Sequence, residues 1–183
     1  MSEKIDTKIL DLRSHQHLHH WVFLIDAQVN DYEEACDEAA GARAPCGERS
    51  VGRLTANLTV ADMGIEDAPA GWTRATPLVM TPHCHAPSCL REELWNADTG
   101  EILCNMTARY GDAAFGELGR AFNEQSYVTM APCLFGDEPG LQYPFNLTAD
   151  TNLTAVKYFN NTFRHLGQMA QWTGLLVYDT DTY

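Results

Sequence analysis

Short stretches in which apolar and polar residues alternate, divided by turn residues, run through most of the chain. In the segment Arg53–Val60 every second residue is apolar, which is typical of a strand with one buried face. The turn Asn96–Gly100 contains a glycine and divides two further stretches, so it predicts a hairpin. Further strands are predicted at 21–27, 75–81, 90–95, 101–110, 126–131 and 169–178, with apolar segments at 142–147 and 153–163.

This succession of about eight short strands indicates an all-β protein. Strands separated by Gly, Pro and Asn turns predict an antiparallel β-sandwich that is jelly-roll-like in its connections. Only Asp31–Ala44 has a helix-forming composition, and its glycine and Pro45 limit any helix to a few turns. Residues 1–18 are richer in charge and predict an extended N-terminal arm, followed by a single β-sandwich domain over 19–183.

The charge balance narrows the range of partners. In 183 residues, 12 basic and 25 acidic side chains give a net charge of −13. A protein that binds nucleic acid needs a basic surface to meet the phosphates, so the charge argues against nucleic acid and against an anionic membrane surface. No apolar run approaches the roughly 20 residues that a membrane-spanning helix needs, so we expect no membrane span.

Cysteines and sequons point to a secretory compartment. The six cysteines form an even set, which suits three disulfides. Sequons matter only where N-linked glycans are added. The first ten residues lack the apolar stretch of a signal peptide. We therefore expect a secreted or extracellular glycoprotein whose leader is absent from this chain; the alternative is a cytosolic protein with reduced thiols. The five Asn-x-Thr sequons begin at Asn57, Asn105, Asn146, Asn152 and Asn160.

Six cysteines allow 15 pairings, and their spacing favours one of them. Two pairs would enclose short loops, and the third would join the ends of neighbouring predicted strands. A thiolate metal site is the alternative, although the chain has no C-x-x-C spacing of the kind found in zinc ribbons. The expected disulfides are Cys36–Cys46, Cys84–Cys89 and Cys104–Cys133.

Histidines are concentrated before the first predicted strand. The segment SHQHLHHW, residues 14–21, holds four of the seven histidines in the chain. In an extended strand alternate imidazoles face the same way and could bind copper, nickel or zinc. The alternative is a solvated polar arm. His19 and His20 are the expected metal ligands within this segment.

A second candidate site combines His83, His85 and Met169. The two histidines are two positions apart, so in a strand both imidazoles point to one face and Cys84 points to the other. Met169 begins the last predicted strand, where a thioether is either core packing or a soft metal ligand. Two imidazoles and one thioether favour copper over zinc, so copper is the expected cofactor. The alternative is a pair of histidines on an exposed strand that bind no metal.

Short motifs also occur in an order that resembles a known family. They are HHWV from His19, HCHAPSC from His83, EILC from Glu101, YVTMAPC from Tyr127 and HLGQM from His165. This order is similar to that of the plant and microbial stress-up-regulated nodulin proteins. More remotely, it resembles the catalytic core of the ascorbate-dependent type II copper monooxygenases, such as peptidylglycine hydroxylating monooxygenase.

The resemblance implies a β-sandwich and two kinds of copper ligand. Its oxygen-activating copper would match His83, His85 and Met169, and its electron-supplying copper would match His19 and His20. If the chain were an enzyme, it would be a copper-dependent monooxygenase. Those enzymes use two sandwiches, whereas about 60 residues separate His20 from His83, too few for a complete domain. The resemblance therefore supports the fold and a copper site more strongly than hydroxylation.

A structural role is the alternative function. A glycosylated, disulfide-linked sandwich could be an extracellular building block. The segment TKILDL, residues 7–12, could add as an edge strand to the sheet of a neighbouring copy. Repeated head-to-tail addition generates homo-oligomers or filaments.

Overall fold

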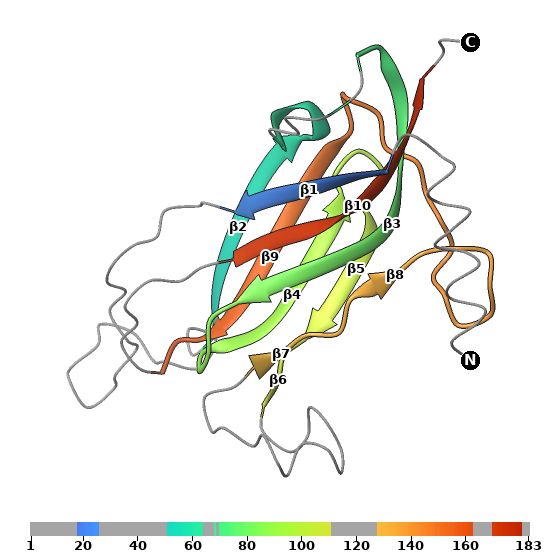
Figure 1. The fold of residues 1–183 in the computed structure, drawn as a ribbon. Coiled ribbons are helices and arrows are strands. Elements are labelled where there is room, and N and C mark those ends of the chain that lie inside the picture. Colours follow the sequence, from blue (N-terminus) through green and yellow to red (C-terminus); the bar gives the residue numbers. More distant parts are fainter. Residues whose placement is uncertain are drawn as a thin grey trace.

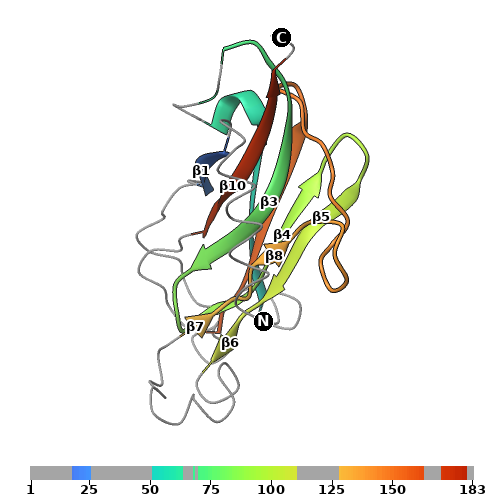
Figure 2. The same cartoon turned by 45° about the vertical axis from the view of Figure 1, so that its right-hand side comes forward.

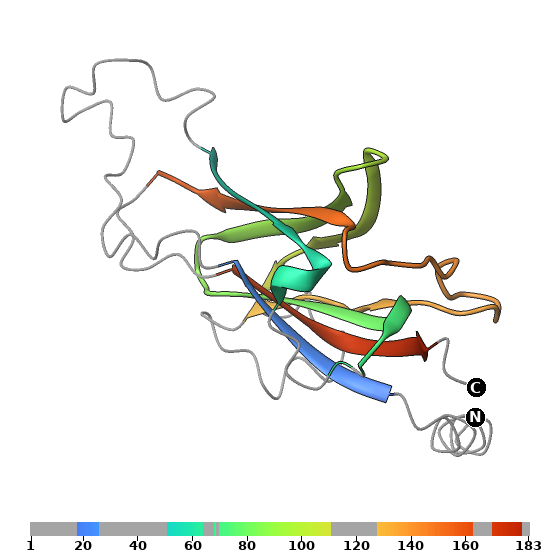
Figure 3. The same cartoon turned by 90° about the horizontal axis from the view of Figure 1, so that it is seen from above.

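Two four-stranded sheets face each other and form a β-sandwich (Figure 1). The computed structural model describes residues 51–63, 68, 70–110, 128–162 and 170–179 in full, and residues 18–25 and 180 as backbone. Seen from above, the sheets form two layers (Figure 3). All pairings between named strands are antiparallel, so the all-β sandwich predicted from the sequence is confirmed.

The first sheet has the strand order β1-β10-β3-β8. Its strands are β1 (Leu18–Ile25), β10 (Ala170–Thr180), β3 (Trp72–Cys84) and β8 (Cys133–Leu134). The long strands β3 and β10 form its centre. Along β10, buried residues alternate with half-buried ones, as expected for a strand with one face against the core.

The second sheet has the strand order β2-β9-β4-β5. Its strands are β2 (Val51–Thr59), β9 (Asn152–Asn160), β4 (Cys89–Asn96) and β5 (Glu101–Thr107). β4 and β5 form the predicted hairpin, with Gly100 at a positive φ of 73° in its turn. A side chain at this angle would be strained, which explains the glycine.

Three short elements complete the described chain. The 3-10 helix η2 (Val60–Met63) follows β2, and β6 (Arg109–Tyr110) pairs with β7 (Val128–Thr129) beside the sandwich. Among the described residues, no helix is long and apolar enough to cross a membrane.

The strands pair in the order of a jelly roll. β1 pairs with β10, β2 with β9, β3 with β8 and β4 with β5. This is the pairing of one long hairpin of eight strands that has been wrapped on itself, which puts successive strand pairs alternately into the two sheets. Figure 2 shows the layer with β10 and β3 beside the layer with β4 and β5. The expected jelly-roll character is therefore present.

Apolar side chains from both sheets fill the space between them. Met80, Trp172 and Leu176 of the first sheet are fully buried, and so are Leu94 and Leu153 of the second. Burying each such side chain contributes about 2 kcal/mol to the stability of the fold. The core is thus shared between the two layers, and neither sheet is stable without the other.

Both described disulfides cross from one sheet to the other. Cys84–Cys89 joins the end of β3 to the start of β4, and Cys104–Cys133 joins β5 to β8. These are two of the three pairs expected from the sequence. The third, Cys36–Cys46, lies outside the described residues. Disulfides persist in oxidising compartments, so the two bonds indicate such an environment.

Several predicted boundaries differ from the observed ones. β1 begins at Leu18 and ends at Ile25 rather than spanning 21–27, and β3 begins at Trp72 rather than residue 75. The predicted strand 126–131 contributes only β7, and β8 begins after Pro132, which lacks a backbone N–H for a ladder bond. The predicted helix and most of the N-terminal arm lie outside the described residues.

The neighbouring carboxylates Glu92 and Glu93 are both buried, although adjacent residues of a strand point to opposite faces of the sheet. Glu93 lies on the outer face and accepts hydrogen bonds from Trp95 Nε1 at 3.1 Å and from the Tyr158 hydroxyl at 3.2 Å. Arg91 adds an ion pair with Glu93 at 3.2 Å and covers the Tyr158 ring. Long neighbouring side chains therefore shield a carboxylate on the outside of the sheet.

Candidate metal centre

The end of β3 carries polar and sulfur ligands on opposite faces. Pro82 and Cys84 are buried against the core, whereas His83 between them is exposed. In the pairing with β10, His83 lies opposite Gln171 and Cys84 lies opposite Ala170. β3 ends at Cys84, so His85 belongs to the short loop that the Cys84–Cys89 disulfide closes.

The two imidazole rings of His83 and His85 lie together even though His85 is beyond the strand. Their centroids are 5.5 Å apart and their planes are perpendicular. A zinc or copper ion sits roughly 2.0 Å from an imidazole nitrogen, so the centroids of two rings on one ion lie up to about 6 Å apart. The observed separation therefore allows one cation to bind both rings.

Electrostatics favour the metal-binding form of His83. Partial burial lowers the pKa of His83, and the nearby His85 and Lys157 lower this pKa further. The unprotonated imidazole is the form that offers a lone pair to a metal. A His83 that resists protonation is thus ready to bind at neutral pH.

Met169, the predicted thioether ligand, lies outside the described residues. Its covalent neighbour Ala170 is the first residue of β10 and pairs with Cys84, between the two histidines in sequence. Adjacent strands are about 4.8 Å apart. The last described backbone next to Met169 therefore lies beside Cys84, the residue between the two histidines.

The N-terminal pair His19 and His20 belongs to a different part of the sheet. In β1 these residues pair with Leu176 and Leu175 of β10, whereas His83 pairs with Gln171 on the other side of β10. Two strand spacings and four residues along β10 separate the backbones of His20 and His83 by roughly 16 Å. The two histidine pairs would therefore hold separate ions.

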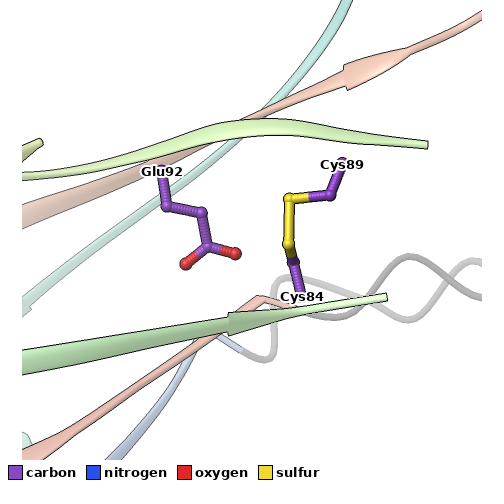
Figure 4. Close-up of side chains that lie close together, drawn as sticks. All are labelled: Cys84, Cys89 and Glu92. Atoms are coloured by element: carbon purple, nitrogen blue, oxygen red, sulfur yellow. A yellow bond between two sulfur atoms is a disulfide. The ribbon is translucent and has the colours of Figure 1, made fainter. Parts of the chain in front are cut away.

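A second group of side chains of metal-ligating type lies on the inner face, between β3 and β4, although its two cysteines are joined in a disulfide. A sulfur of Cys84, a sulfur of Cys89 and a carboxylate oxygen of Glu92 all lie within 4.8 Å of one another. Figure 4 shows the Glu92 carboxylate between β4 and β3, on the side of the disulfide. Sequence reasoning missed Glu92 as a candidate, although its position two residues before the core residue Leu94 places both on the inner face.

The Glu92 carboxylate is fully buried and unsatisfied. Among the described residues, neither of its oxygens has a hydrogen-bond partner. Burial raises the pKa of Glu92 to about 8, and the charge of Lys157 acts in the opposite direction. Lys157 is also fully buried and pairs with Glu92 across β9 and β4. The inner face thus holds a carboxyl group that is mostly protonated at neutral pH.

Four of the five sequon asparagines lie on the outer face of the second sheet. Each alternates with a neighbour that packs against the core: Ala56, Cys104, Leu153 and Phe159. The fifth lies in the loop before β9, where its side chain accepts a hydrogen bond from Thr76 Oγ1 at 2.8 Å. The four asparagines on the second sheet are Asn57, Asn105, Asn152 and Asn160.

Comparison with protein-family models and with curated proteins finds no match to this chain. The class of protein is therefore defined by its own geometry. It is a disulfide-linked β-sandwich with jelly-roll strand order, of the kind that matures in an oxidising compartment.

Proposed function

We propose that the protein is a secreted glycoprotein that binds copper through His83, His85 and Met169. The observation that carries the proposal is the pairing of two exposed imidazole rings, with centroids 5.5 Å apart, at the end of β3. The lowered pKa of His83 supports it, because the neutral ring is the ligand. The position of Ala170 opposite Cys84 supports Met169 as the third ligand.

Copper fits this ligand set better than other metals. Imidazole binds copper in both oxidation states, and a thioether prefers the soft Cu(I) ion. Zinc sites prefer imidazole, thiolate and carboxylate, and the nearest thiols on the strand face inward and are joined in a disulfide. The two histidines would therefore bind both Cu(I) and Cu(II), whereas Met169 would strengthen the binding of Cu(I) alone.

Metal titration of the purified protein tests the site. We expect His83→Ala and His85→Ala each to weaken Cu(II) binding by about tenfold or more, because even neighbours of metal ligands have effects of this size. Met169→Leu should weaken Cu(I) binding, measured by competition with a chromogenic chelator under argon, and leave Cu(II) binding nearly unchanged. Glu101→Gln, at the exposed start of β5 in the other sheet, is the control and should bind as the parent does. Full copper binding by both histidine variants refutes the proposal.

The placement of the sequons supports the glycoprotein part. Asn57, Asn146 and Asn160 use the amide oxygen to accept hydrogen bonds, which leaves the nitrogen that carries a glycan pointing away from these contacts. Asn152 differs, because its amide nitrogen donates to Asp98 at 2.7 Å. Mass spectrometry of protein made in a secretory host should find glycans at Asn57, Asn146 and Asn160, and a lower glycan occupancy at Asn152. Absence of glycan from Asn57, Asn146 and Asn160 refutes the glycoprotein part of the proposal.

A further inference from the structure

The HCH segment has a second face that the copper proposal leaves unused. Cys84 points inward, toward Cys89 and Glu92 of β4, while the histidines are exposed. The Met130 thioether adds a third sulfur, because its Sδ lies 3.3 Å from Cys84 Sγ. Three sulfurs and one carboxylate from separate segments thus converge between the sheets.

Glu92 is the feature that a purely structural disulfide does not explain. Its side chain is fully buried, its two oxygens have no hydrogen-bond partner among the described residues, and they lie on the side of the disulfide (Figure 4). A buried carboxyl group without hydrogen bonds costs stability, and a hydrocarbon side chain of similar size would avoid that cost. A bound cation is the partner that would satisfy this group.

The geometry is compatible with a tetrahedral site once the sulfur–sulfur bond is opened. Thiolate–zinc bonds of about 2.3 Å place two sulfurs of one zinc ion roughly 3.8 Å apart. The Cα atoms of Cys84 and Cys89 are 6.2 Å apart, so side-chain rotation alone can provide that separation. The carboxylate oxygen already lies within 4.8 Å of both sulfurs.

The charges also balance in the interior. Two thiolates and one carboxylate carry three negative charges. A divalent cation neutralises two of these charges, so one negative charge remains. Lys157 is buried on the neighbouring strand, directly opposite Glu92 in the backbone register, and its positive charge compensates the remaining negative charge. A neutral cluster is the arrangement that a core of low polarity tolerates best.

We propose that reduction of the Cys84–Cys89 disulfide creates a buried site for a divalent cation of the zinc class, held by both thiolates and Glu92. The reductant is a dithiol, which is oxidised to its own disulfide while two cysteine thiols form. The cation then displaces one proton from each thiol and the proton of the Glu92 carboxyl group. Met130 supplies the fourth donor, which suits zinc less than the softer cadmium.

This site is independent of the proposed copper site. β3 separates the two, because His83 lies on the outer face and Cys84 on the inner face. The copper site is present in the oxidised protein, and the thiolate site forms only after reduction. A result that refutes one leaves the other in place.

Limited reduction followed by cobalt titration tests the proposal. The glycosylated protein is treated with dithiothreitol, freed from it under argon, and its new thiols are mapped by alkylation and mass spectrometry. Folding is followed by circular dichroism. We expect Cys84 and Cys89 to be freed while the sheets remain, and Co²⁺ to give thiolate-to-cobalt charge-transfer absorption at one ion per chain. Zinc should displace the cobalt.

Three variants assign the ligands. Glu92→Gln should weaken Co²⁺ binding by about tenfold or more, whereas Glu101→Gln, on the exposed start of β5, should bind as the parent does. A variant with both Cys84→Ser and Cys89→Ser should show no thiolate absorption from this site. The proposal is overturned if the disulfide yields only when the sheets unfold, or if Glu92→Gln binds cobalt as tightly as Glu101→Gln does.

Discussion

Replacement of Glu92 by glutamine should remove a large pH dependence from the stability of the oxidised protein. The pKa of Glu92 is raised from 4.5 to about 8 by burial. In the unfolded chain the group ionises near its ordinary pKa, so between these two values the folded state holds a proton that the unfolded state has lost. The favourable contribution is complete below the unfolded pKa and is lost as the pH rises through the folded pKa.

The magnitude follows from these two values. Stability falls by up to about 1.4 kcal/mol per pH unit across this window. Between pH 5 and pH 7 the wild-type free energy of unfolding should therefore fall by about 2.5 kcal/mol from this group alone. Glu92→Gln cannot ionise, so its curve lacks this slope, whatever constant shift the amide itself causes.

Urea unfolding at pH 5, 6, 7 and 8 measures the effect. The difference between wild type and Glu92→Gln isolates Glu92 from the histidines, which titrate in the same range in both proteins. Glu101→Gln, an exposed substitution, controls for the loss of one negative charge. Parallel curves for wild type and Glu92→Gln would refute the reasoning, and would mean that Lys157 holds the carboxylate ionised in the core.

Three further predictions test the scaffold. Serine at both Cys104 and Cys133 should lower the free energy of unfolding by about 3.5 kcal/mol, since the bond closes a loop with a sequence separation of 29; a chemical unfolding curve measures it. Gly52→Ala should cost about 1–3 kcal/mol, because its new Cβ would overlap the Phe159 ring, and the melting temperature should fall accordingly. Asp98, whose pKa is lowered by hydrogen bonds from Asn152, stabilises the fold above its ordinary pKa of 3.8. The difference in stability between wild type and Asp98→Asn should therefore shrink as the pH falls below 3.8, as acid titration of fluorescence would show.

The fold class was predictable because the alternation of residues survives in the structure. In β2, Leu54, Ala56 and Leu58 are more buried than the residues between them, as the pattern of Arg53–Val60 predicts. Boundaries were less predictable, because pairing partners distant in the chain decide where a strand ends. β1, for example, starts at Leu18 because it pairs with β10 from that position.

One of the two candidate sites was predictable from the sequence and the other was not. His83 and His85 were identified from their spacing, and the structure places their rings together. The buried group around Glu92 was not identified, because its partners come from β3 and β9 and no local pattern connects them. Nor does any local pattern show that Tyr158 and Trp95 shield Glu93 on the outside of the sheet.

The pairing of β1 with β10 has a consequence for how the molecule is made. Ile25 pairs with Ala170, so the first sheet closes only after the ribosome has synthesised its last strand. Contacts between residues so distant in the chain slow folding. Until β10 is made, the edge of β1 that it will cover has unpaired backbone groups, which can pair with another chain. If Asn57 and Asn105 carry the proposed glycans, sugars added there before β10 is made would keep the unfinished chain soluble during the delay.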